Sequence, residues 1–182
     1  MGLFPLLLCQ AMASAPGGSK SVAVVFPSLP QTQMDFTALP QAAMQTPFDT
    51  AALFVAAMCL YPQKPAEAIA MVEYLKGPQP LSGYDKQFLA DRMRGKDYLP
   101  LSFFAGATPA NGYTPTRPYT ITVSENPYSY QEQGYAKLII ASGGADSPRP
   151  IQLRLAKDNR WYLWEQFLLS DIRPPESSNP WA

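Results

Sequence analysis

Two predicted turns carry side chains that could bind a ligand or a partner. The turn NPYSY presents Tyr128 and Tyr130 directly after a predicted strand. The turn GGADSPR combines two glycines with Asp146 and Arg149, so its backbone N–H groups could hold an anion beside a guanidinium. The alternative is structural: Asp146 would close an Asx turn and Arg149 would pair with it at the surface.

A predicted helix, SGYDKQFLADRMRG, contributes a carboxylate and a guanidinium. Asp85 and Arg92 lie seven residues apart within one broad arc of this helix, so they could face each other across two turns. Such a pair would bind an anion or exchange protons. The alternative is a helix cap plus an arginine that ties the helix to a neighbouring loop. Asp85, Asp91 and Asp97 lack the alternating spacing of a calcium loop, so we predict no metal site.

The composition removes several kinds of catalytic site. The 182 residues include no histidine, which excludes Ser-His-Asp and Cys-His nucleophile pairs and the common zinc sites. Two cysteines, Cys9 and Cys59, exclude a disulfide framework and a CxxC metal site. No GxGxxG or phosphate-loop spacing occurs. We expect no cofactor and no catalytic residue, and a non-catalytic function is favoured although an enzyme stays open.

The charge and the first residues bear on partners and location. Lys+Arg and Asp+Glu are both 14, and no basic stripe interleaves with aromatic residues, so we expect no nucleic acid. No run approaches the roughly 18 apolar residues of a transmembrane segment. The start MGLFPLLLCQAMASAP is similar to a signal peptide, but it contains no Lys or Arg and Pro5 interrupts its apolar core. We expect a cytoplasmic protein, with export through a weak signal peptide in residues 1–15 as the alternative.

The elements that must position these side chains are helices followed by strands. Helix-start signals at Thr46-Pro47, Pro65 and Ser82 predict three helices. Alternating apolar and polar residues predict four strands, PYTITVSE, YAKLIIAS, PIQLRLAK and RWYLWEQ. The pattern indicates an α+β fold in which about three N-terminal helices pack on a four-stranded, twisted antiparallel sheet.

The N-terminal segment and the longest connection differ from the predicted helices and strands. Residues 1–45 are rich in Pro, Gln and Ala, and we predict an N-terminal arm there, in which SVAVVF could add one edge strand to the sheet. Residues 46–182 are predicted to form a single α+β domain. Residues 98–118 form a long connection that should lie against the core and could serve as a lid.

Several segments resemble a family of bacterial proteins known as a domain of unknown function. They are FDTAALFVAAMCLYP, LKGPQPLS, FFAGATPANGYTP and SGGADSPRPIQLR, and the resemblance extends over roughly residues 21–182. It implies an intracellular protein with an uncleaved N-terminus and brings no catalytic residue. The element order is also similar to the NTF2-like α+β cone, an analogy of fold that confers no function.

These observations favour a binding or accessory protein that recognises a protein partner through its aromatic turns, since Tyr, Trp and Arg dominate contact energetics. One alternative is a small-molecule pocket or a histidine-independent enzyme in an NTF2-like cavity. There Asp85 or Asp91 would act as a carboxylate of raised pKa beside Arg92. A second alternative is an exported envelope protein. The oligomeric state stays open.

Overall fold

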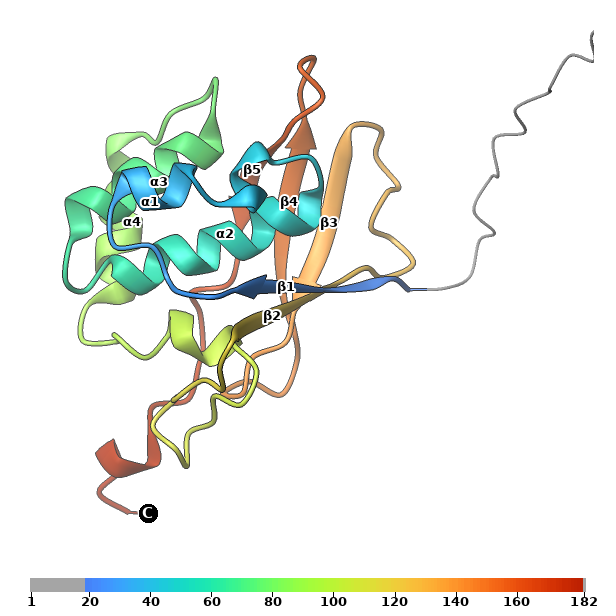
Figure 1. The fold of residues 1–182 in the computed structure, drawn as a ribbon. Coiled ribbons are helices and arrows are strands. Elements are labelled where there is room, and N and C mark those ends of the chain that lie inside the picture. The colour runs from blue at the N-terminus through green and yellow to red at the C-terminus, as the bar shows by residue number, and fades with distance from the viewer. Residues whose placement is uncertain (1–18, 182) are drawn as a thin grey trace, which may run out of the picture.

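The computed structural model describes residues 19–181, which form a layer of helices on one face of an antiparallel sheet (Figure 1). The central helix is α2 (Pro47–Leu60), and nearly all of its side chains are buried. It begins as predicted: Pro47 occupies the first turn, and the Thr46 hydroxyl accepts a hydrogen bond from Asp49 N. A helix that is apolar on every face must lie inside the protein, and α2 does.

Within residues 19–181, the helical layer contains three further α-helices. They are α1 (Gln33–Thr37), α3 (Pro65–Lys76) and α4 (Gly83–Met93). Of these, α3 packs against α2 and α1 packs against α3. Helix α3 ends at Gly77, whose φ of +59° suits glycine, and a Cβ there would collide with the ring of Tyr162. Helix α4 begins at a reciprocal capping box between Ser82 and Asp85, as its sequence predicts.

The sheet has five antiparallel strands in the order β1-β2-β3-β4-β5. The four predicted strands are present as β2 (Tyr119–Ser124), β3 (Tyr135–Ile140), β4 (Arg149–Leu155) and β5 (Trp161–Gln166). SVAVVF forms β1 (Ser21–Phe26), the edge strand beside β2. The α+β prediction is confirmed. The elements number four α-helices and five strands in residues 19–181, rather than three and four, because α1 and β1 join the fold.

The sheet bends sharply between β2 and β3. The two strands share only the pairs Val123↔Ile140 and Ser124↔Ile139, whereas β1 and β2 pair along their whole length. In Figure 1, β1 and β2 run across the direction of β3, β4 and β5. The bend lets side chains of both halves of the sheet reach α2.

Residues outside the predicted core elements are also buried. Phe26, Phe36 and Met44 are fully buried, so the stretch that we expected to form an arm contributes to the same core as α2. In the long connection, the buried Tyr113 ring stacks on Tyr98 at a centroid distance of 5.4 Å. Such contacts make this connection part of the core rather than a lid.

The two remaining sequence-based expectations concern membranes and the N-terminus. Among residues 19–181, no helix has both the length and the apolarity to cross a bilayer. The possible signal peptide in residues 1–15 lies outside the described residues, as does Cys9.

Candidate functional site

The NPYSY turn presents two tyrosines at the surface. Tyr128 is 63% exposed and Tyr130 is 49% exposed. The turn is fixed by a hydrogen bond from Tyr128 N to Asn126 Oδ1 at 2.8 Å. The Tyr130 hydroxyl donates to Glu125 Oε1 at 2.7 Å, and burial together with this carboxylate raises the pKa of Tyr130. Tyr130 is therefore a neutral phenol at physiological pH, suited to contact rather than to nucleophilic or base chemistry.

The acid and the base of the GGADSPR turn do not pair with each other. Asp146 pairs with Arg173, with 2.8 Å between Oδ1 and Nη1. The Arg149 guanidinium instead donates to main-chain oxygens, from Nε to Ser170 O at 3.0 Å and from Nη2 to Asp171 O at 3.0 Å. The expected Asp146–Arg149 pair is wrong, because the C-terminal segment supplies partners to both side chains.

The other interpretation of this turn, an anion nest at the two glycines, is also wrong. Gly143 N donates to Ser102 O at 2.9 Å, and Gly144 N donates to Ser142 Oγ at 3.1 Å. A Cβ on Gly143 would collide with the main-chain oxygen of Ala107. These glycines permit close packing of two loops, and their N–H groups are already engaged.

Asp85 and Arg92 are likewise kept apart. The Asp85 carboxylate accepts hydrogen bonds from Ser82 Oγ at 2.7 Å and from Ser82 N at 2.8 Å, and both bonds lower its pKa. The Arg92 guanidinium lies over the Phe88 ring, 5.0 Å from its centroid. The structure thus supports the alternative of a helix cap, and the pKa shift is opposite in direction to that of a raised-pKa acid.

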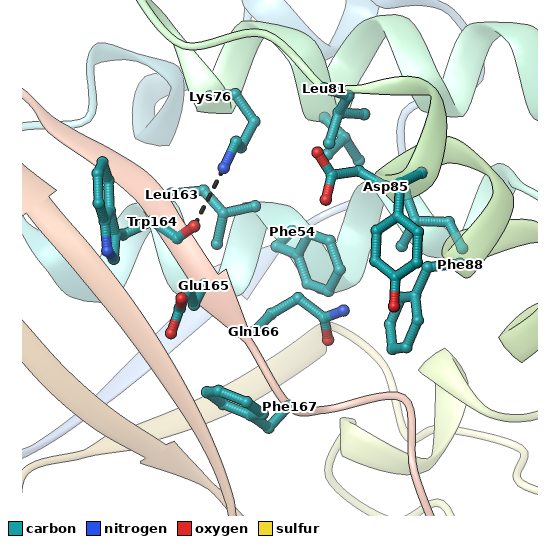
Figure 2. A pocket seen from close by; sticks show the side chains of 13 residues that line it. Phe54, Lys76, Leu81, Asp85, Phe88, Leu163, Trp164, Glu165, Gln166 and Phe167 are labelled. Carbon is teal, nitrogen blue, oxygen red and sulfur yellow. Dashed lines mark hydrogen bonds between the residues drawn. The ribbon is translucent and has the colours of Figure 1, made fainter.

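The chain has a pocket between α3, α4 and β5, which we call the β5 pocket (Figure 2). Its volume is about 260 Å³. Figure 2 shows the Phe54 ring, from the central helix α2, in the middle of the pocket, with Asp85 and Gln166 on either side of it. The aliphatic part of the lining consists of four side chains, Val72, Leu81, Leu89 and Leu163.

The rim of the β5 pocket combines aromatic and charged groups. Tyr84 is 78% exposed and Phe167 is 53% exposed, and both line the pocket. Lys76 Nζ donates to the main-chain oxygen of Trp164 at 3.0 Å, drawn as a dashed line in Figure 2. Asp85 and Glu165 contribute carboxylates. The pocket can therefore bury an apolar group of a ligand, while the polar groups at its rim contact the adjoining part of the same ligand.

Of the six candidate residues from the sequence, the β5 pocket includes only Asp85. Sequence reasoning missed Lys76, Gln166 and Phe167. The one sequence signal for this pocket was that the last predicted strand is aromatic on both faces. Its outer-face aromatic, Trp164, packs edge-on against Tyr135 on β3 at 5.8 Å.

Outside the β5 pocket, the potentially metal-binding and nucleophilic side chains of residues 19–181 do not form a second candidate site. No group of three or more His, Cys, Asp or Glu side chains in this part of the chain is arranged to hold a metal ion. Cys59, on α2, is a free thiol whose pKa is raised by burial. A buried thiol of raised pKa is a poor nucleophile.

Comparison with known proteins places the chain in a family. Residues 28–176 match the family described as a domain of unknown function, DUF6935, and the chain belongs to it. The match confirms the resemblance seen in the sequence. No curated protein and no solved structure is significantly similar to the chain.

Proposed function

We propose that this protein is a non-catalytic binding protein that holds an apolar side chain of a protein partner in the β5 pocket. The observation that carries the proposal is an apolar pocket whose rim holds two exposed aromatic rings, Tyr84 and Phe167. Large apolar groups at the surface of a soluble domain mark interaction sites when they lie around a concavity. Aromatic rings that lose water on binding contribute much of the energy of protein contacts.

The size of the pocket favours a side chain over a cofactor. Sites for small molecules typically enclose roughly 300–1,000 Å³. The β5 pocket, at about 260 Å³, lies just below that range. Complete burial of one Leu, Phe or Met side chain contributes about 1.5–3 kcal/mol. A single such side chain, supported by rim contacts, would supply a substantial part of the affinity of a transient complex.

The state of the polar groups supports binding rather than catalysis. Asp85 is held ionised by Ser82, and Lys76 is engaged with a main-chain oxygen. A general acid at neutral pH needs a raised carboxyl pKa. The hydrogen bonds from Ser82 lower the pKa of Asp85 instead, which is opposite to that requirement.

Selection from a displayed library of random 12-residue peptides tests the proposal. Wild-type protein should enrich peptides that share a large apolar residue. The double variant Tyr84→Ala/Phe167→Ala should bind those peptides at least tenfold more weakly, because truncation of a hot-spot aromatic residue costs about 2 kcal/mol or more. The variant should remain folded, since both side chains are mostly exposed.

The matched control is Tyr128→Ala/Tyr130→Ala, which removes two exposed aromatics from the NPYSY turn. We expect this variant to bind the selected peptides like the wild type. If the control loses binding and the pocket variant does not, the partner is recognised by the NPYSY turn, and the β5 pocket is the wrong site.

A small-molecule ligand is the second candidate. Lys76 and Asp85 place opposite charges beside an apolar floor, which suits a small amphipathic molecule with a charged head. Screening a fragment library by ligand-observed NMR distinguishes the two functions. Fragments that bind in the pocket with high affinity, together with no peptide enrichment, would favour this second function.

A further inference from the structure

The free edge of β5 forms one wall of the β5 pocket. Strand β5 is the last strand in the sheet order, so β4 pairs with only one of its sides. An edge strand presents main-chain N–H and C=O groups that can pair with another chain. Glu165 and Gln166, at the end of β5, both line the pocket.

Much of this edge is already engaged by the protein itself. Near the start of β5, Trp161 N donates to Met44 O at 2.9 Å, and Thr50 Oγ1 donates to Trp161 O at 2.6 Å. In the middle, Lys76 Nζ donates to Trp164 O at 3.0 Å. These bonds occupy main-chain groups of Trp161 and Trp164 on the free side of β5, so a partner strand cannot pair with them.

The register shows that Gln166 is different. Phe167 N donates to Pro150 O at 3.0 Å, and Ile151 lies opposite Gln166. In an antiparallel ladder, hydrogen-bonded and non-hydrogen-bonded pairs alternate, so Ile151 and Gln166 form a non-hydrogen-bonded pair. The N–H and C=O of Gln166 consequently point away from β4, and no group in residues 19–181 outside the sheet bonds to them.

We propose that the occupant of the β5 pocket is an extended segment of a partner protein, whose main chain pairs with Gln166 while one large apolar side chain enters the pocket. This inference rests on the proposed function and specifies the binding mode. Addition of a strand to a sheet edge takes affinity from main-chain hydrogen bonds and specificity from pockets for alternate side chains. At the β5 edge, Gln166 supplies the free main-chain groups and also lines the apolar pocket.

The charges around the pocket indicate the neighbour of that apolar residue. The lining has one ammonium, Lys76, against two carboxylates, Asp85 and Glu165. Lys76 already donates to Trp164 O, and the low pKa of Asp85 keeps its carboxylate charged. A basic residue next to the apolar one would meet this excess of negative charge, so the expected partner segment carries a Lys or Arg beside a large apolar side chain.

The test uses the peptides enriched by wild-type protein from the random 12-residue library, resynthesised with N-methyl groups at successive positions. Methylation of the one peptide N–H that pairs with Gln166 should weaken binding about tenfold, the loss expected for about 1.4 kcal/mol. Methylation at the neighbouring residues on either side should have little effect, because their N–H groups point the other way. Replacing the flanking basic residue by Gln should weaken binding and reduce its dependence on salt.

Hydrogen exchange supplies an independent readout. Peptide binding should slow exchange of the Gln166 amide at least tenfold and leave Ala23, on the opposite edge strand β1, unchanged. Peptides that bind in the pocket without a methylation-sensitive position and without protection of Gln166 would overturn the inference and leave the proposed function standing. Failure to enrich any peptide would overturn both. Protection of Gln166 that grows with protein concentration alone would identify a second copy of the chain as the occupant and would likewise overturn the inference.

Discussion

Lys76 Nζ lies 3.0 Å from the main-chain oxygen of Trp164 and donates a hydrogen bond to it. This bond joins the last residue of α3 to the edge strand β5 and closes one end of the β5 pocket. It satisfies a carbonyl that has turned away from the ladder at a break in the β4–β5 register, where Trp164 has no partner on β4. The same bond therefore fixes the helix, the strand and the pocket between them.

Replacing this lysine should destabilise the fold modestly. Lys76→Met keeps the aliphatic stem and removes the donor, so we expect a loss of about 0.5–1.5 kcal/mol in the free energy of unfolding. Urea denaturation followed by tryptophan fluorescence measures the change. The matched control is Lys86→Met, which breaks a solvent-exposed ion pair with Glu73. The control should change stability by less than about 0.5 kcal/mol, and equal effects of the two variants would argue against a structural role for Lys76.

The capping box of α4 predicts a pH dependence. The folded-state pKa of Asp85 is lowered by hydrogen bonds from Ser82, so its contribution to stability is complete above its unfolded pKa near 4. That contribution is lost as the pH falls through the lower folded pKa. Asp85→Asn should therefore reduce stability at pH 7 and flatten the decline in stability as the pH falls below about 4.

Ser82→Ala removes the two hydrogen bonds of the Ser82 hydroxyl, with the Asp85 carboxylate and with Asp85 N, and leaves the bond from Ser82 N. We expect it to cost about 0.5–2 kcal/mol at pH 7 and to bring the pKa of Asp85, measured by NMR titration, back towards the usual value. The double variant should cost less than the sum of the two single variants, because both disrupt the same capping box. Fully additive losses would show that the two side chains do not act as a unit.

Two glycines provide a test of loop packing. Gly143→Ala would drive a Cβ into the main-chain oxygen of Ala107, and we expect it to destabilise the protein by about 1–3 kcal/mol. Gly83→Ala, at the first position of α4, meets no atom within 4 Å and should be neutral or stabilising by up to about 1 kcal/mol. Thermal unfolding of the two variants side by side measures the difference. Equal midpoints would show that the contact between these loops relaxes freely.

The parts of the fold that were predicted from the sequence depend on local rules. The caps at Thr46 and Ser82 act over three residues, and strand alternation has a period of two, so both can be read from short segments. The apolar α2 was expected to be central because no face of it could meet water. The structure confirms these predictions about the individual elements.

The candidate site was harder to predict because its contacts join distant segments. The partners of Asp146 and Arg149 come from residues about 20 to 30 positions later, and no local rule selects Arg173 over Arg149 for Asp146. The β5 pocket brings α2, α3, α4 and β5 together, and its open main-chain position at Gln166 follows from strand register. Register and helix placement are properties of the assembled sheet, which single-residue spacing does not encode.

Chemical-shift mapping tests the central claim, that the β5 pocket is the binding surface, most directly. ¹⁵N-labelled protein would be titrated with the enriched peptides, and amide shifts would be followed along the whole chain. We predict that the largest changes fall on the residues that line the pocket, from Lys76 through Leu89 and from Leu163 to Phe167. Shift changes concentrated at residues 126–130 and 142–149, with the pocket residues unaffected, would contradict this claim. They would show that the NPYSY and GGADSPR turns form the binding surface.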